Sequence, residues 1–253
     1  MSEFIAIDRT DHVLSLTLDR PAKKNALTAD MYAALTAALR DAEADREVRV
    51  VVLSARGDAF CAGNDIGDFV AANSGDFVDA PVRFLSAIAE LSVPIVAAVH
   101  GAAIGIGTTM LLHCDVVCAA HDATFRMPFV DLALTPEAAS TYLLPALIGH
   151  HRAARLLLMA EPFDAATAHE LGLIAHVVRR EELLESARGI AAEIAAKPPE
   201  AVRATKRLMK APHREAIARA FADEFDEFGR RLTSAEAQER FAAFFARTPS
   251  LDS

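Results

Sequence analysis

Apolar and polar residues alternate over positions 13–18, with a leucine at every second position, and this period of two predicts a half-buried β-strand. Residues 48–53 form a nearly continuous apolar run of strand length, which is typical of a parallel strand covered on both faces. Residues 95–99 and 115–119 repeat this apolar pattern. The four segments predict the strands of one sheet.

Helical periodicity appears between these strands. Thr28 is suited to cap a helix, whose apolar face consists of Met31, Leu35, Ala38, Leu39 and Ala42. We expect two further helices, one from about Gly105 and one from about Pro136. Strands that alternate with helices imply right-handed βαβ crossovers and a mostly parallel sheet, so the sequence predicts an α/β fold.

The chain changes character after about residue 180, where the strands are expected to end. The remaining sequence predicts four helices, over residues 181–196, 200–210, 216–231 and 234–247. Phenylalanines are concentrated in this tail, which therefore has apolar faces that must be covered. Packing against the chain's own domain and a subunit interface are both open explanations.

The composition agrees with one large core. The chain has 253 residues, of which 53% are hydrophobic and 24% charged, so it fits a single α/β domain with a helical appendix. The net charge of −9 argues against a nucleic-acid partner held by its phosphates. Cys114 and Cys118 lie in an apolar run and are expected to be buried thiols, and the histidines show no metal-binding spacing, so no metal site is expected.

No segment of the sequence resembles a membrane anchor or a targeting signal. The apolar stretches 93–99 and 102–112 are too short, or too interrupted by glycine, to span a bilayer. Residues 1–4 lack the features of a signal peptide, and residues 251–253 are not a peroxisomal signal. We therefore expect a cytoplasmic protein with no membrane partner.

Two glycine-containing segments are candidates for chemistry. Residues 59–66 follow a predicted buried strand, and residues 100–107 lie between a predicted strand and a helix. Glycines at such junctions let the backbone approach a ligand and point free N–H groups outward, although each alone is also what an ordinary structural turn requires. The second segment lacks the spacing of a dinucleotide-binding fingerprint, and the chain has no phosphate-binding P-loop.

Taken together and in order, these segments resemble the crotonase superfamily, a family of acyl-CoA enzymes that includes enoyl-CoA hydratases and isomerases. The matching stretches are residues 20–27, 60–66, 94–107, 114–115 and 168–174. The resemblance implies a spiral of ββα turns over residues 1–195, which would hold the coenzyme A and acyl sites. It also implies a helical trimerisation region over residues 196–253, and assembly as a homotrimer or a dimer of trimers.

The resemblance also implies the site residues. The backbone N–H groups of Asn64 and Ile106 would form an oxyanion hole for the thioester carbonyl, which becomes negative when its α-proton leaves. Coenzyme A would enter as part of an acyl-CoA substrate, so no separate cofactor is expected. The substrate-binding positions are Lys24, Ala26, Ala62, Gly63, Asp65, Ile66, Gly105 and Phe129. Apolar residues between positions 68 and 90 are expected to shape the acyl tunnel.

The acidic residues indicate which reaction to expect. Hydratases of this family use two glutamates, and the corresponding positions here are Thr109 and Phe129, so water would lack its usual base. Glu137 matches instead the catalytic glutamate of the peroxisomal-type Δ3-Δ2-enoyl-CoA isomerases. It would remove a proton from C2 of a 3-enoyl-CoA and return it to C4. Thr135 and Pro136 would also make Glu137 part of an ordinary helix start, where the helix dipole lowers its pKa while an apolar pocket raises it.

Three other interpretations stay open. Glu137 could activate water, which would give a hydratase or a thioester hydrolase. The chain could also be an acyl-CoA-binding relative that has lost its chemistry. In the tail, Lys206, Arg207 and Lys210 could meet the phosphates of coenzyme A or could be a solvated helix face.

Overall fold

The computed structural model describes residues 2–65, 67 and 76–247. Its main sheet has six strands in the order β1-β2-β3-β4-β6-β9. Their bounds are Ile5–Thr10 (β1), Val13–Leu18 (β2), Val50–Ala55 (β3), Ile95–Val99 (β4), Val116–Ala120 (β6) and His176–Val178 (β9). The pairs from β2 to β9 are parallel, which confirms the predicted parallel sheet.

An antiparallel hairpin and a second sheet were not predicted. β1 pairs antiparallel with β2 at the edge of the main sheet. A small sheet of order β5-β7-β8 contains Ala102–Ile104 (β5), Thr124–Arg126 (β7) and Phe163–Asp164 (β8). Because β4 leads into β5 and β6 leads into β7, the chain passes from the main sheet to the small one twice. The predicted glycine segment 100–107 lies at the first of these passages.

The main sheet is buried on both faces. In β3, Val51 and Leu53 belong to one apolar cluster, and Val50 and Val52 belong to another on the opposite face. Helices α1 (Ala29–Ala44) and α3 (Asp76–Glu90) pack together, and residues of both belong to the first cluster. Helix α8 (Leu183–Ala195) covers the second face. The continuous apolar pattern of β3 follows from this two-sided burial.

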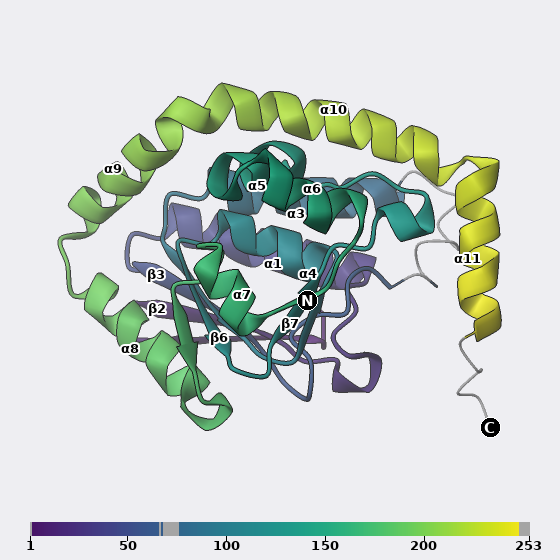
Figure 1. Ribbon diagram of the computed structural model, residues 1–253. Helices are drawn as coiled ribbons and strands as arrows, with labels where there is room; N and C mark the ends of the chain where they lie inside the picture. The colour runs from purple at the N-terminus through teal and green to yellow at the C-terminus, as the bar shows by residue number, and fades with distance from the viewer. Residues whose placement is uncertain (1, 66, 68–75, 248–253) are drawn as a thin grey trace.

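The C-terminal helices form an arc around the rest of the molecule. They are α9 (Pro199–Lys210), α10 (Arg214–Leu232) and α11 (Ala235–Arg247). Figure 1 shows α10 passing over α5 (Ser140–Ile148) and α6 (His150–Leu158), with α11 descending at its far end. Phe228 and Phe241 are buried against the chain's own core, so part of the apolar face of the tail is covered within one chain. The prediction of a tail of helices is confirmed.

Two of the expected helices begin or end elsewhere. The helix expected from about Gly105 is the short α4 (Ile106–Thr109), which continues as a 3-10 turn, Met110–His113. The helix expected from Pro136 begins only at Ser140, and its N-cap residue is Ala139 rather than Thr135. Ala138 and Ala139 have left-handed φ angles of 65° and 53°, which interrupt the helix that the sequence favours.

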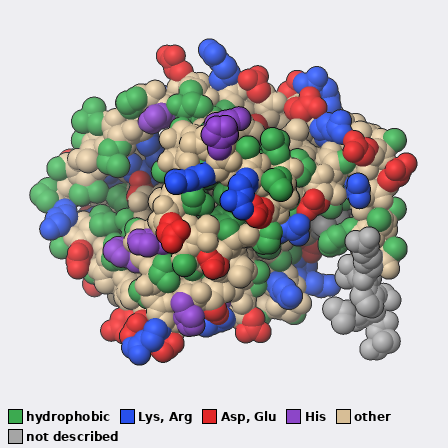
Figure 2. All heavy atoms as spheres, viewed as in Figure 1, with side chains coloured by type: hydrophobic (Ala, Val, Ile, Leu, Met, Phe, Trp, Pro, Cys, Tyr) green, Lys and Arg blue, Asp and Glu red, His purple; other side chains and the backbone are tan. Residues whose placement is uncertain are grey.

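The surface carries both signs of charge. In the face shown in Figure 2, acidic and basic side chains are interspersed among hydrophobic ones over the helices. The net charge of −9 is therefore not concentrated in one patch of that face. None of the helices in the described part of the chain is long and apolar enough to cross a membrane.

Candidate active site

The loop that contains Asn64 is attached to the chain through Leu27. The Leu27 N–H donates to Gly63 O at 2.8 Å, and the Asp65 N–H donates to Leu27 O at 2.9 Å. This parallel bridge uses the residues on either side of Asn64, so the Asn64 N–H faces away from Leu27. The Asn64 N–H donates no hydrogen bond within the described residues.

Gly63 brings this loop close to strand β5. Its φ of 98° is in the region that favours glycine, and a Cβ atom there would lie 3.2 Å from Ile104 O. The neighbouring bridge between Cys61 and Ala103 pairs the same two segments. The two glycine-containing segments of the sequence are therefore adjacent in space.

The second segment exposes the first N–H group of α4. Gly105 donates its N–H to Arg126 O at 2.8 Å, and its carbonyl accepts from the N–H groups of Thr108 and Thr109. Ile106 is the first residue of the helix, and its own N–H has no acceptor in the part of the chain that is described. An unpaired amide at this position is the usual condition of a helix N-terminus.

Both amides belong to residues that line one cavity of about 440 Å³. Its wall combines the two glycine segments with residues 126–134 and with the apolar faces of α10 and α11. Of the expected site residues, it includes Ala62, Gly63, Asn64, Gly105, Ile106 and Phe129. Arg126, Asp131 and Arg240 add charged side chains to the lining. A largely apolar wall with a few polar groups is typical of a small-molecule site.

Lys24, Ala26 and Asp65 lie beside this cavity and do not line it. The Ala62 N–H donates to Lys24 O at 2.9 Å, and Arg20 bridges the Ala26 carbonyl at 3.0 Å and the Asp65 carboxylate at 2.6 Å. Residues 20–26 and 62–65 therefore form one continuous edge. The expected contact of Ile66 lies outside the described residues.

Asn25 is an anchor of this edge that the sequence did not reveal. It is completely buried, its side-chain oxygen accepts from the Arg20 N–H at 2.7 Å, and its amide donates to Arg56 O and Ala59 O at 2.8 Å each. Its left-handed φ of 56° is one that asparagine tolerates better than most residues. The side chain thus ties residues 20–25 to the segment 56–59, which leads into the loop that contains Asn64.

The residues predicted to shape an acyl tunnel, between positions 68 and 90, are not found in the wall of this cavity among the described residues. Residues 68–75 lie outside the described part of the chain, and none of residues 79–90 lines the cavity. The apolar wall comes instead from Phe129, Leu132 and Leu134 and from the tail residues Phe228 and Phe241. That contribution of the tail has no local signal in the sequence, because it depends on how α10 and α11 fold back.

Glu137 is a buried carboxyl in contact with α4. The Thr109 hydroxyl donates to Glu137 Oε1 at 2.5 Å, and Glu137 is 5% exposed. Burial raises the pKa of Glu137 to about 8, the Thr109 hydrogen bond lowers it, and the negative charge of Glu224 raises it. Glu137 is not among the described residues that line the cavity.

The side chain of Asn64 is hydrogen-bonded to a buried tyrosine near Glu137. The hydroxyl of Tyr32 donates to Asn64 Oδ1. Burial raises the pKa of Tyr32, and the negative charge of Glu137 raises it further. Glu137 therefore lies within electrostatic reach of the tyrosine that holds Asn64.

The expected placement of Glu137 in the first turn of a helix is wrong. Because α5 begins at Ser140, Glu137 precedes the helix by three positions, and the Thr135 hydroxyl is buried without a described hydrogen-bond partner. The carboxylate of Glu224 occupies the N-terminus of α5 instead. Burial is the largest influence on the pKa of Glu137, and it raises that pKa.

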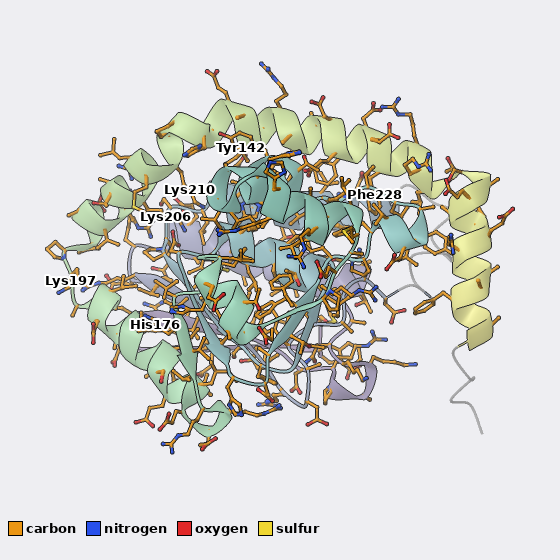
Figure 3. All side chains as sticks on the ribbon, in the orientation of Figure 1. Tyr142, His176, Lys197, Lys206, Lys210 and Phe228 are labelled. Atoms are coloured by element: carbon orange, nitrogen blue, oxygen red, sulfur yellow. The ribbon has the colours of Figure 1, made fainter. Side chains whose placement is uncertain are left out.

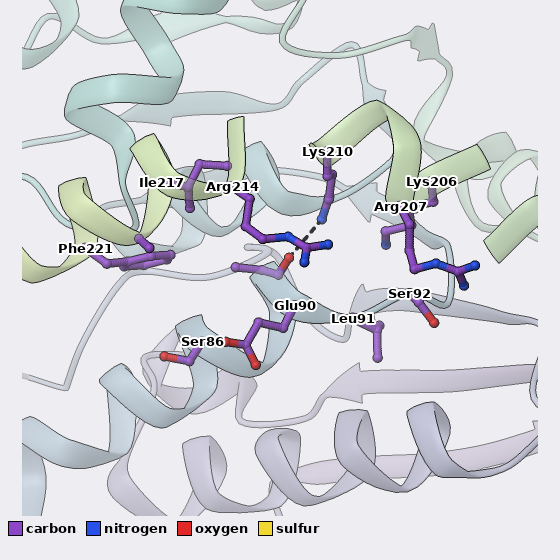
Figure 4. Close-up of a pocket in the computed structure, with 12 residues that line it drawn as sticks. Ser86, Glu90, Leu91, Ser92, Lys206, Arg207, Lys210, Arg214, Ile217 and Phe221 are labelled. Carbon is purple, nitrogen blue, oxygen red and sulfur yellow. Dashed lines mark hydrogen bonds between the residues drawn. The ribbon is translucent and has the colours of Figure 1, made fainter. Parts of the chain in front are cut away.

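The basic residues of the tail belong to a different cavity. Lys206, Arg207 and Lys210 line a space of about 470 Å³ between α3 and α9–α10 (Figure 4), and Figure 3 shows Lys206 and Lys210 far along the arc from Phe228. Lys206 is buried and donates to Asp115 Oδ2 at 2.7 Å and to Val93 O at 2.8 Å. Its ammonium group is thus already paired inside the protein.

Comparison with known proteins identifies the family. Residues 8–250 match the sequence model described as enoyl-CoA hydratase/isomerase. The chain is 37% identical over 205 residues to the 1,2-epoxyphenylacetyl-CoA isomerase of Escherichia coli K12, covering 78% of each chain. It is 32% identical over 258 residues to the enoyl-CoA delta isomerase 2 of Rattus norvegicus, covering 99% of this chain and 65% of the rat protein.

The fold agrees with this match. The crystal structure of an enoyl-CoA hydratase/isomerase from Pseudoalteromonas atlantica T6c superimposes with a TM-score of 0.92 at 42% identity, covering 96% of this chain and 97% of that chain. The α/β fold with its helical tail is thus that of the crotonase superfamily, as expected. The chain belongs to the enoyl-CoA hydratase/isomerase family and is an acyl-CoA enzyme of that family.

Proposed function

We propose that the protein converts a 3-enoyl-CoA into the 2-enoyl-CoA, with Glu137 as its single acid and base. The observation that carries this proposal is the buried carboxyl of Glu137, hydrogen-bonded to Thr109 at the position where family hydratases have an acid. Phe129, at the other such position, lines the cavity with an apolar ring. One acid suffices for moving a proton, whereas hydration also needs a group to activate water.

The pair of free amides supports the stabilisation of an enolate. The N–H groups of Asn64 and Ile106 would donate to the thioester oxygen, and one such donor typically contributes about 3 kcal/mol to transition-state stabilisation. Glu137 takes a proton from C2, and the electron pair moves toward the thioester to give a dienolate. Glu137 then returns the proton to C4, so the product is an isomer and the carboxylate is regenerated.

The pKa of Glu137 suits both halves of this cycle. With a pKa of about 8, roughly one molecule in ten carries an ionised Glu137 at pH 7. A carboxyl of this strength binds the transferred proton firmly enough to deliver it to C4. The proposal requires the carboxyl to face the acyl chain when substrate fills the cavity.

The second buried carboxyl beside Glu137 is not suited to activate water. Glu224 accepts hydrogen bonds from Ala139 N, Thr141 N and the Thr141 hydroxyl, so its two oxygens are occupied by the protein. The occupied carboxylate of Glu224 therefore supports isomerisation over hydration.

We propose that coenzyme A lies along the edge formed by residues 20–26 and 62–65.

The test compares three reactions of the purified protein with one variant. We expect isomerisation of 3-enoyl-CoA, no hydration of 2-enoyl-CoA and no release of free coenzyme A. Glu137→Gln should lower kcat for isomerisation by roughly 100- to 10,000-fold while acyl-CoA binding is retained. Unchanged turnover in the variant would remove Glu137 as the base, and hydration or thioester hydrolysis by the wild type would replace the proposed reaction.

We also propose a homotrimer or a dimer of trimers. Leu158 and Met159 of the α6 end, and Leu208 and Met209 of α9, are each about 70% exposed in the single chain. Large apolar side chains in such numbers are often covered by a partner. Sedimentation equilibrium tests this proposal, and a monomer across the micromolar range would refute it.

A further inference from the structure

The backbone that follows Glu137 is held in an unfavourable conformation. Ala138 and Ala139 have φ angles of 65° and 53°, a region that residues with a side chain rarely adopt. Two consecutive residues of this kind persist only where other contacts hold them, because each costs of order 1 kcal/mol. Two buried polar side chains from distant parts of the chain provide those contacts.

The first is Glu224 of α10, which is 5% exposed. Its Oε2 accepts from the Ala139 N–H at 2.6 Å, and its Oε1 accepts from the Thr141 N–H at 2.9 Å and the Thr141 hydroxyl at 2.6 Å. Every partner is a donor, and two of them are amides at the N-terminus of α5. Burial raises the pKa of Glu224 to about 7, while these donors favour its ionised form.

The second is His113, which is 3% exposed. Burial lowers the pKa of His113 to about 4, so the ring is neutral at pH 7, and its Nε2–H donates to Ala138 O at 2.8 Å. The ring stacks on Phe221 with centroids 5.7 Å apart. Phe221 and Glu224 are three residues apart on α10, so one helix holds both contacts.

We propose that Glu224 is a positioning residue that fixes residues 138–141 so that the Glu137 carboxyl meets Thr109. Because Glu224 Oε2 accepts from the Ala139 N–H, two residues beyond Glu137, its carboxylate also brings a negative charge close to Glu137. The positioning and charge effects exist whatever the reaction. Their consequence for catalysis rests on the proposed function. Besides Glu224, three groups of the described chain that interact with Glu137 are neutral at pH 7: Thr109 from α4, Tyr32 from α1 and Cys61 from the loop before Asn64.

The first test measures the free energy of unfolding from pH 5 to pH 9. Because Glu137 binds its proton more firmly in the folded state than in the unfolded state, it stabilises the protein below about pH 4.5 and loses that contribution as pH rises to about 8. The difference between wild type and Glu137→Gln isolates this loss. In the Glu224→Gln background, the stabilising contribution of Glu137 should be lost at a lower pH than in the wild-type background. The reason is that one neighbouring negative charge is gone, which lowers the pKa of Glu137.

Glu227→Gln is the matched control. Glu227 also lies on α10, is partly exposed and pairs with Arg230 at 3.0 Å, so the substitution removes the same charge at the surface. We expect it to leave the pH range of the Glu137 contribution unchanged. Equal pH ranges in the Glu224→Gln and wild-type backgrounds would overturn the charge effect.

The second test separates position from charge. Glu224→Asp keeps the charge but shortens the reach to Ala139 and Thr141, so kcat should fall while KM and the pH range of Glu137 stay close to wild type. An unchanged kcat would overturn the positioning role, and this variant tests that role even if Glu224→Gln does not fold. If the proposed function fails, the wild type will not isomerise 3-enoyl-CoA. The pH-dependent differences in unfolding free energy between wild type and the Glu137 and Glu224 variants would still be observed.

Discussion

The Thr109 hydroxyl donates to Glu137 Oε1 at 2.5 Å across 28 positions of the sequence. The family resemblance assigns Thr109 to the position of a hydratase glutamate and Glu137 to the position of an isomerase glutamate. These two positions are direct neighbours in this fold.

Removal of the Thr109 hydroxyl should weaken the base. Thr109→Val removes a hydrogen bond that lowers the pKa of Glu137, so a smaller fraction of Glu137 is ionised at pH 7. A hydrogen bond to a charged group contributes about 1.5–3 kcal/mol, so kcat/KM at pH 7 should fall by roughly 10- to 100-fold. The pH at which activity is half-maximal should rise.

The adjacent threonine provides the control for this experiment. The Thr108 hydroxyl is also buried but donates to Ala103 O, at 2.5 Å. Thr108→Val should reduce stability without moving the pH profile. An equal displacement of the profile in both variants would show that the hydrogen bond to Glu137 has no special effect.

The pH dependence of the wild-type reaction follows from the same carboxyl. Glu137 must be ionised to accept the C2 proton, and its pKa is about 8. We expect kcat/KM to rise about tenfold per pH unit below this value and to level off above it. Initial rates with 3-enoyl-CoA from pH 5.5 to 9.5 measure the curve. A profile already level at pH 6 would contradict a base with a raised pKa.

Gly107→Ala should disturb the start of α4, which carries the Ile106 N–H, through a steric clash. A Cβ atom at this position would lie 2.6 Å from Cys61 O and 2.9 Å from Cys61 Cβ. The backbone at the start of α4 must then move, and overpacking of this kind costs about 1–3 kcal/mol. We expect lower thermal stability and lower kcat. Gly189→Ala in α8, where a Cβ meets nothing within 4 Å, should leave activity unchanged and stability equal or higher.

Lys206→Met tests whether this cation serves the fold or the substrate. Its partner Asp115 also accepts from the Ile95 N–H at 2.7 Å, so loss of the ammonium leaves a partly buried carboxylate at the start of β4. Breaking such a pair costs about 3–5 kcal/mol when fully buried, and we expect somewhat less here. Urea denaturation measures the loss, with the exposed Lys197→Met as a control. A large drop in acyl-CoA affinity without loss of stability would assign Lys206 to the phosphates instead.

The sequence predicted the parts of the fold that depend on local apolar pattern. Residues 95–99 were predicted as a strand with the bounds that β4 has, since this run is buried on both faces. Strand β1 was missed because four of its six residues are exposed and leave no clear alternation. The family resemblance that the glycine segments carry implied a shared site for Asn64 and Ile106, and both residues line one cavity.

The start of α5 shows why the rest could not be predicted. Thr135, Pro136 and Glu137 satisfy every local rule for a helix start, yet the helix begins at Ser140. The decisive contact comes from Glu224, 85 residues beyond Ala139, and nothing in the sequence around Glu224 distinguishes it from other acids of an amphipathic helix. The strength of the acid at Glu137 is thus set by tertiary contacts.

Helix α10 carries Phe221, Glu224 and Phe228 at helical spacing, so the contacts that hold the segment after Glu137 and part of the cavity wall belong to one helix. If the proposed function is correct, a substitution that rotates or shifts α10 changes both the fit of the acyl group and the pKa of Glu137. Related proteins that prefer different acyl chain lengths should therefore also differ in their pH optima.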